Sequence, residues 1–292
     1  MTKQQSSYLF AGLSILAWST VSTAFKLTLK YCSPLGLLLM SSLIATVLLA
    51  IMVLISKQGF GSFFQNMRRS TPAGFLNPYL YYVILFTAYS RLRAQEAQAL
   101  NYTWAIVLSV LMVLFMRERF RIKDLGALLF SFLGVLIISA KGHLLDLRFD
   151  DTQGTLLALG SSLVWASYWM VNLRDNRENT LKLFYNFLVG SILIMTHVLI
   201  FQSQILLKQD TLIPAMLGAM WVGVFEMGLT FILWLKALQY TENSAKITNL
   251  IFLTPFVSMF MIQSILKESI HPATIVGLLL IVGSNLLQKY YN

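Results

Sequence analysis

The sequence predicts an all-α polytopic membrane protein, with ten transmembrane helices in two inverted five-helix repeats around a central cavity. Three observations lead to this prediction. The chain of 292 residues is 57% hydrophobic and only 12% charged, whereas soluble domains average about 25% charged residues. Its apolar runs are close to the roughly 20 residues that a membrane-spanning helix needs. Its two halves also carry similar residues at matched positions.

Polar breaks between the apolar runs define the individual spans. Pro34 follows the polar turn YCS after the first run, and the segment RDNREN ends the sixth. The interval RLRAQEAQ between the third and fourth runs is the shortest break. Hydropathy places the spans at residues 8–29, 34–56, 75–93, 96–116, 124–141, 154–173, 181–201, 214–235, 245–265 and 273–290.

The basic residues lie in the breaks between the apolar runs, and they predict the orientation of the chain. The formal net charge is +10, but these residues occur singly or in short clusters, which argues against a nucleic-acid partner. More Lys and Arg fall on the face that holds the N-terminus, so both termini are predicted to be cytoplasmic. The first run leads directly into further spans and is predicted to be a retained helix. Cys32 is the single cysteine and excludes an internal disulfide.

An internal repeat divides the chain into residues 1–148 and 149–292. Trp18 in SILAWST is matched by Trp165 in SSLVWAS, and Glu118 in MRERF is matched by Glu268 in LKESI. Each half has five predicted spans, and an odd number means that the second half enters the membrane from the opposite side. Inverted repeats are typical of transporters, in which the substrate site lies near mid-membrane between the two copies.

These tryptophans and helix-ending glutamates, in this order, resemble the EamA-type transporters of the drug/metabolite transporter superfamily. The resemblance covers essentially the whole chain and is stronger in the second half, where FLTPF precedes LKES. It implies a ten-helix fold with a cavity lined by the first, third, fourth, sixth, eighth and ninth helices. It also implies export or exchange of small metabolites such as amino acids across a bacterial inner membrane, without a nucleotide or metal cofactor.

Glu226 is the carboxylate that most needs an explanation, because the eighth predicted span contains no other charge. A charged group at mid-membrane is costly unless it is paired, protonated or facing water. One interpretation is a protonated carboxyl that fixes helix packing. The other is a cavity group that binds a cation or exchanges a proton, since a carboxyl removed from water holds a proton more readily. Thr230 and Gly223, each about one turn away, predict a small polar face around it.

Lys26 is the second candidate for binding or coupling charge. It follows Ser19, Ser22 and Thr23 at helical spacing, so these residues predict a polar stripe beside Trp18. Its long side chain could reach the headgroups instead of the cavity. If Lys26 faces the cavity, it could bind a substrate carboxylate or pair with Glu226.

Aromatic and uncharged polar side chains complete the predicted site. Aromatic residues at helical spacing serve either as packing anchors or as cavity walls that clamp an apolar or cationic group. The polar residues of the fourth and ninth spans serve either helix contacts or the cavity. The predicted substrate-binding residues are Trp18, Ser22, Tyr82, Tyr89, Asn101, Tyr102, Trp165, Trp169, Glu226 and Asn249.

Three further titratable residues are interpreted as structural. His197 lies within the seventh span, which is peripheral in the family. Glu118 and Glu268 end their helices and are expected to pair with nearby Arg or Lys. The histidines are scattered, and no HExxH or GxxxxGK[ST] motif occurs, so neither an enzyme nor direct ATP drive is indicated.

The sequence therefore predicts a secondary transporter that works by alternating access. The favoured substrates are amino acids or similar amphipathic metabolites, and the favoured direction is export. Glu226 and Lys26 are the candidates for proton or charge coupling. The alternative is an uptake carrier for an organic cation or another small metabolite. A channel or a membrane scaffold stays open, and the sequence predicts no oligomeric state.

Overall fold

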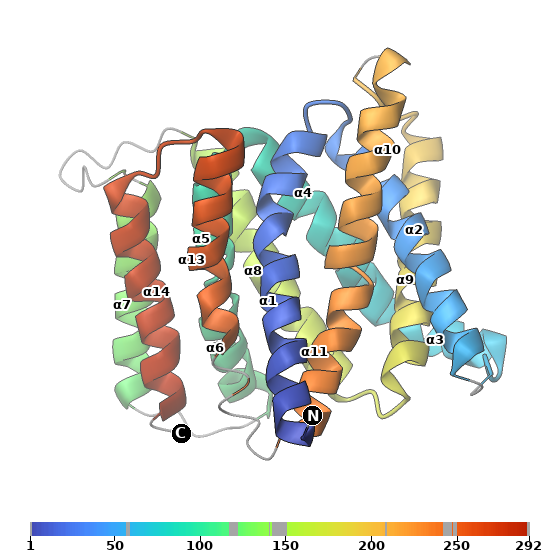
Figure 1. Ribbon diagram of the computed structural model, residues 1–292, viewed down its shortest axis with the longest axis horizontal. Coiled ribbons are helices and arrows are strands. Elements are labelled where there is room, and N and C mark those ends of the chain that lie inside the picture. The colour runs from blue at the N-terminus through green and yellow to red at the C-terminus, as the bar shows by residue number, and fades with distance from the viewer. Residues whose placement is uncertain are drawn as a thin grey trace.

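A computed structural model of the chain describes residues 2–56, 59–116, 122–139, 141, 151–207, 209–241, 247 and 250–290. The regular elements of these residues are helices (Figure 1). In chain order they are α1 (Lys3–Thr28), α2 (Pro34–Ile55), α3 (Phe63–Gly74), η1 (Phe75–Leu80), α4 (Tyr81–Arg91), α5 (Ala94–Asn101), α6 (Trp104–Met116), α7 (Ile122–Ser139), α8 (Thr152–Leu173), α9 (Asn179–Ile200), η2 (Gln209–Thr211), α10 (Leu212–Trp221), η3 (Val222–Glu226), α11 (Leu229–Tyr240), η4 (Ile251–Leu253), α13 (Thr254–Met261), η5 (Ile262–Leu266) and α14 (Pro272–Tyr290).

Several of these helices are long and apolar enough to cross a membrane. By length and composition, six helical stretches among the described residues qualify: Lys3–Thr28, Pro34–Ile55, Ala94–Phe115, Thr152–Leu173, Asn179–Ile200 and Leu212–Tyr240. Shorter apolar helices cover Leu129–Ile138, Ile251–Leu266 and Pro272–Ser284. The chain is thus a multi-pass helical membrane protein, while the number of ten crossings stays a prediction.

Side-chain caps explain where the helices begin. The Ser33 hydroxyl accepts a hydrogen bond from the Gly36 N–H, and Pro34 occupies the first turn of α2. Asp151 and Glu178 accept from the N–H groups of the first turns of α8 and α9. Each cap satisfies backbone donors that have no partner within the helix. The polar breaks of the sequence therefore mark helix starts.

The region of the third predicted span differs from the prediction. The helical path begins at Phe63, well before the predicted start, and passes through the wide turn η1 before it continues as α4. The polar interval after α4 is also shorter than expected, because α5 already begins at Ala94. Its polar residues Gln95 and Glu96 are buried, and the sequence RLRAQEAQ is therefore mostly helix.

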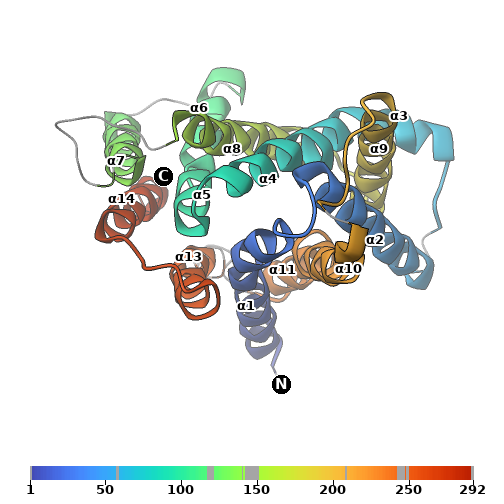
Figure 2. The same ribbon diagram turned by 90° about the horizontal axis from the view of Figure 1, so that it is seen from above.

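The two halves pack with a pseudo-twofold relation. Helix α1 of the first half contacts α11 and α13 of the second half. Helix α8 of the second half makes the corresponding contacts with α4, α5 and α6 of the first half. The remaining large contacts join equivalent helices, α2 with α9 and α7 with α14, at opposite sides of the bundle (Figure 2). Exchange of the two halves therefore maps each of these contacts onto itself or another of them.

The halves also run in opposite directions. Lys26, near the end of α1, bonds the backbone of Leu92, and the neighbouring Arg91 forms an ion pair with Asp151, which caps the start of α8. The second half therefore begins where the first helix ends, while both chain termini lie at the other end of the bundle (Figure 1). We call these the α1-exit end and the termini end.

Candidate functional site

A cavity of about 410 Å³ lies between the two halves. Its walls come from α1, α4, α5, α6, α8, η3, α11, η4 and α13, which belong to the six helices that the resemblance implied. It extends toward the termini end, because Leu173 is the last residue of α8 and Leu238 lies near the end of α11. The cavity is lined by Trp18, Val21, Ser22, Phe25, Tyr81, Leu85, Tyr89, Gln98, Asn101, Tyr102, Trp104, Leu108, Trp165, Trp169, Leu173, Glu226, Phe231, Trp234, Leu238, Ile251 and Thr254.

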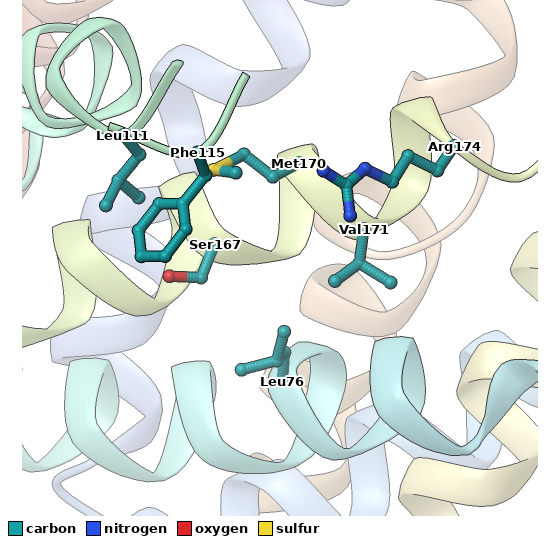
Figure 3. A pocket seen from close by; sticks show the side chains of 7 residues that line it. All are labelled: Leu76, Leu111, Phe115, Ser167, Met170, Val171 and Arg174. Carbon is teal, nitrogen blue, oxygen red and sulfur yellow. The ribbon is translucent and has the colours of Figure 1, made fainter. Parts of the chain in front are cut away.

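A second hollow of about 200 Å³ lies between η1, α6 and α8. Figure 3 shows Leu76 on one side of it and Leu111 and Phe115 on the other, with Arg174 at its edge. Its remaining lining residues are Ser167, Met170 and Val171. It is smaller and contains no carboxylate, so the central cavity is the better candidate for a specific site.

Eight of the ten predicted substrate-binding residues line the central cavity. Of the other two, Tyr82 is fully buried behind the wall, and Asn249 lies outside the described residues. The eight that line it are Trp18, Ser22, Tyr89, Asn101, Tyr102, Trp165, Trp169 and Glu226.

The two repeat-related tryptophans stand on either side of a phenylalanine. The ring centroids of Trp18 and Phe231 are 5.6 Å apart, and those of Phe231 and Trp165 are 6.2 Å apart. Trp234 packs against Trp18 at 5.7 Å, and Trp169 lies edge-on to Trp165 at 6.0 Å. These rings form a continuous aromatic wall that can hold an apolar group or, through the ring faces, a cation.

Glu226 is partly buried and reaches the cavity from the end of the π-turn η3. The Tyr82 hydroxyl donates to its Oε1 atom at 3.0 Å. Within the described part of the chain, no Lys, Arg or His lies within ion-pair distance of this carboxyl. Glu226 is therefore held by one neutral donor and has no cationic partner of its own there.

The small polar face expected around Glu226 is not present. A Cβ atom on Gly223 would lie 2.7 Å from the backbone oxygen of Ser41, so this glycine serves the close approach of α2. Thr230 is fully buried, and its hydroxyl donates to the backbone carbonyl of Phe225. The π-turn adds a residue to the helical turn, so the 3.6-residue spacing does not carry across it.

Lys26 is turned away from Glu226. Its ammonium group donates to the backbone oxygens of Tyr89 at 2.6 Å and Leu92 at 2.5 Å, at the C-terminus of α4. The negative end of a helix attracts such a cation, and these carbonyls have no partner within the helix. Lys26 thus forms no ion pair with Glu226 in this structure, and its binding of a substrate carboxylate or coupling of charge stays a prediction.

Neutral hydrogen bonds fix the polar side chains of the cavity. The hydroxyls of Ser22 and Tyr89 are 2.7 Å apart, which ties α1 to α4. Tyr81 donates to the Oδ1 of Asn101 at 3.3 Å, and the Nδ2 of Asn101 donates to Ser161 at 2.8 Å. The cavity thus presents hydroxyl and amide groups in fixed positions, and the Tyr81 ring packs against Trp165 of the aromatic wall at 4.6 Å.

Contacts between the halves close the α1-exit end. The Gln95 side chain donates to the backbone oxygen of Ser269 at 2.9 Å and accepts from the N–H of His271 at 2.9 Å. The N–H of Ala94 reaches the Oε1 of Glu268 at 3.4 Å. Glu268 thus lies at the positive end of α5. The sequence predicted instead that Glu268 pairs with a nearby Arg or Lys. Its partner by repeat, Glu118, lies outside the described residues.

An ion pair on the same end joins the halves at the surface. The Nε of Arg91 is 3.0 Å from the Oδ2 of Asp151. Hydrogen bonds from the Gly154 N–H and from Arg91 hold the pKa of Asp151 below its usual value.

His197 lies away from the cavity on α9. Its Nδ1 is 2.8 Å from the Tyr79 hydroxyl, in agreement with a structural role.

Some cavity residues were not predicted from the sequence, notably Tyr81, Trp104, Phe231, Trp234 and Thr254. Tyr81, Leu85 and Tyr89 share a face at four-residue spacing, and this signal was available for α4. The seven-residue spacing of Tyr82 and Tyr89 predicts a different face, on which Tyr82 is buried behind the wall. For Phe231 no such signal existed, because the preceding π-turn changes the register.

Comparisons with known proteins agree with this architecture. The EamA-like transporter family matches residues 5–140 and again residues 152–288. The chain is 24% identical over 293 residues to the "Uncharacterized transporter YvbV" of Bacillus subtilis (strain 168), with 97% of this chain and 91% of that protein covered. It also has the fold of a protein in a solved crystal structure, with a TM-score of 0.67 at 18% identity over 98% of this chain and 97% of that one. These matches point to a transporter and not to an enzyme, and the chain belongs to the EamA-like transporter family.

Proposed function

We propose that the protein is a secondary active transporter that moves small amphipathic metabolites, with amino acids as the first candidates. The observation that carries the proposal is the central cavity, in which an aromatic wall faces Glu226 and fixed neutral polar groups. An amino acid would place its ammonium group at Glu226 and its side chain against Trp18, Phe231 and Trp165. Its carboxylate would bond neutral donors such as Ser22 and Asn101.

The inverted halves and the contacts at the α1-exit end support transport by alternating access. In the structure the cavity extends toward the termini end, and Gln95 and Glu268 hold the opposite end together. We propose that both termini are cytoplasmic in a bacterial inner membrane, so this state loads substrate from inside the cell. That arrangement supports export, with residues 1–148 and 149–292 as the two moving halves.

A second candidate is an organic cation without a carboxylate, taken up instead of exported. The position of Lys26 favours it, because this ammonium group bonds the α4 carbonyls and is not presented to a substrate carboxylate. Glu226 then supplies the one fixed charge among the described cavity residues, and the tryptophan and tyrosine rings supply the cation–π contacts.

Binding of two matched probes separates the candidates. L-Phenylalanine and 2-phenylethylamine share the aromatic ring and the ammonium group and differ in the carboxylate. Quenching of the cavity tryptophans reports binding of each to the purified protein. Tighter binding of L-phenylalanine supports an amino-acid site, and tighter binding of 2-phenylethylamine supports the cation site.

Transport in liposomes then tests Glu226 itself. The wild type and Glu226→Gln are compared for uptake of the tighter-binding probe under pH gradients of both signs. Loss of the response to the gradient with retained exchange makes Glu226 the proton site. Loss of binding makes it a substrate ligand. Unchanged behaviour of the variant refutes both roles and leaves a packing residue.

A further inference from the structure

A column of buried polar residues lies outside the cavity. It is bounded by three segments, which are α3 together with η1, α8, and α9. Polar residues follow one another on each element at spacings close to helical turns. The column consists of Asn66, Ser70 and Asn77 from α3 and η1, Tyr168 and Asn172 from α8, and Lys182 and Asn186 from α9. None of these residues lines the central cavity, and the elements that carry them contact one another.

The outer part of the column is a complete hydrogen-bond network at the termini end. Arg177, in the turn between α8 and α9, donates to the Oδ1 of Asn66 at 3.1 Å and to Ser70 at 2.7 Å. It also holds Asp175 through bonds of 3.0 Å. Lys182 donates to the backbone oxygen of Asp175 at 3.2 Å. Arg177, Asp175 and Lys182 all stand at this outer end, where Glu178 also lies within electrostatic range of Lys182.

The inner part is different, because its amide groups have no partner. Asn77 and Asn186 are 1% and 0% exposed, and neither the oxygen nor the nitrogen of either side chain forms a hydrogen bond. The Oδ1 of Asn172 is likewise buried and unbonded. The Tyr168 hydroxyl lies within interaction range of both Asn77 and Asn186, but it forms no hydrogen bond of good geometry with either amide. Buried polar groups without partners are rare in proteins, and each demands an explanation.

The mixture of orphaned donors and acceptors identifies the missing partner. A metal cation would satisfy the amide oxygens of Asn77, Asn172 and Asn186 but would leave the two amide nitrogens unpaired. Water both donates and accepts, and a buried water typically makes about three such bonds. The column is therefore suited to water and not to a cation.

The inner end of the column leads toward Glu226. Asn77 lies at the kink within η1, and Tyr82 lies in the first turn of α4, five residues further along the chain. Tyr168 lies within electrostatic range of Tyr82, and the Tyr82 hydroxyl donates to Glu226. The remaining titratable groups around Glu226 are Tyr81, Tyr89 and Tyr102.

We propose that water molecules fill this column and carry protons between the termini end and Glu226, separately from the substrate cavity. A proton taken up by the outermost water passes along the chain to the Tyr82 oxygen. Tyr82 gives its own proton to the Glu226 carboxylate, which becomes a neutral carboxylic acid. The reverse sequence returns the proton. This inference rests on the proposed coupling role of Glu226, but the hydration of the column can be tested without it.

Radiolytic hydroxyl labelling with mass spectrometry tests hydration directly, because bound water labels even a buried side chain. Tyr185 is the internal control: it is as buried as Tyr168, but its hydroxyl already donates to the backbone oxygen of Phe60 at 2.8 Å. We expect faster labelling of Tyr168 than of Tyr185 in the wild type, and equal labelling in Asn186→Leu. Equal labelling in the wild type overturns the proposal.

Transport in liposomes tests the proton path, with the probe that binds more tightly of L-phenylalanine and 2-phenylethylamine. Asn186→Leu is expected to lose accumulation driven by a pH gradient and to keep exchange of labelled for unlabelled probe at equal pH. Asn186→Ser replaces the amide with a hydroxyl group and leaves room for water, so it should keep the driven accumulation that Asn186→Leu loses. Ser191→Ala, a buried change on the same helix but outside the column, should leave both activities intact.

The outcomes distinguish the two proposals. If Asn186→Leu loses exchange as well as driven transport, the column is structural and the proton path is refuted. If it keeps both activities, the path is also refuted. If the wild type itself shows no response to the pH gradient, proton coupling fails, and labelling of Tyr168 alone decides whether the column is hydrated.

Discussion

Gln95 is the side chain whose removal should shift the protein toward opening at the α1-exit end. Its amide makes two hydrogen bonds of 2.9 Å to the segment that follows η5, and both join the first half to the second. Opening at this end must break them. The variant Gln95→Ala removes them from the closed state, while in the open state the glutamine amide bonds water.

The size of the effect follows from these two bonds. Each contributes about 0.5–1.5 kcal/mol net of its exchange with water, so the pair contributes about 1–3 kcal/mol. A shift of this size changes a two-state equilibrium by about 5- to 150-fold. The nearby contact from Ala94 to Glu268 is long, at 3.4 Å, and is not expected to compensate.

Double electron–electron resonance between two spin labels measures the opening. Ser90 and Ser269 are both exposed, and they flank the junction on α4 and after η5. Cysteines placed there can be labelled selectively, because burial raises the pKa of the native Cys32 thiol to about 12 and keeps it unreactive. We expect Gln95→Ala to enlarge the population with the longer distance.

A matched control separates this effect from general destabilisation. Gln65 is an exposed glutamine on α3, and Gln65→Ala should leave the distance distribution unchanged. If Gln95→Ala is folded and gives the wild-type distribution, the Gln95 bonds do not hold this end closed and the reasoning is wrong.

Two further predictions concern stability and are measured by thermal unfolding in detergent. Lys26→Met leaves the two carbonyls at the end of α4 without a donor, at a cost of about 1–3 kcal/mol each. The melting temperature should therefore fall. An unchanged melting temperature with lost L-phenylalanine binding would instead show that Lys26 binds the substrate carboxylate. On α14, a Cβ atom on Gly277 would lie 2.6 Å from the backbone of α7, whereas one on Gly283 meets nothing within 4 Å. Gly277→Ala should therefore destabilise by about 1–3 kcal/mol through overpacking, and Gly283→Ala should not; equal melting temperatures would contradict the close approach of α7 and α14.

The local signals of the sequence were sufficient for several helix starts and for the repeat. Ser33 and Pro34 mark the start of α2 because a capping hydroxyl and a proline suit only the first turn of a helix. Trp18 and Trp165 could be assigned to the cavity because the repeat relates them, and symmetry brings equivalent residues to the same interface. Membrane passage follows from composition, because apolar length alone makes a helix favourable in lipid.

Register across the wide turns could not be read from the sequence. Glu226 is the last residue of the π-turn η3, and the non-helical Gly228 separates it from α11, so helical spacing does not carry from Glu226 to Phe231, which lines the cavity while Thr230 does not. On α4 the choice between Tyr81 and Tyr82 depended on the rotation of the helix, which is fixed by its neighbours. Both tyrosines reach polar partners, Asn101 and Glu226, on other elements.

The sequence by itself determined the membrane class, the paired halves and most of the aromatic wall, because each depends on periodicity or on composition within one segment. The tertiary structure decided which charges meet. Lys26 bonds the α4 carbonyls, Glu268 lies at the start of α5, and Glu226 is left with a tyrosine. These partners lie at least 63 residues apart in the chain, so only the packing of distant helices, and not any local pattern, brings them together.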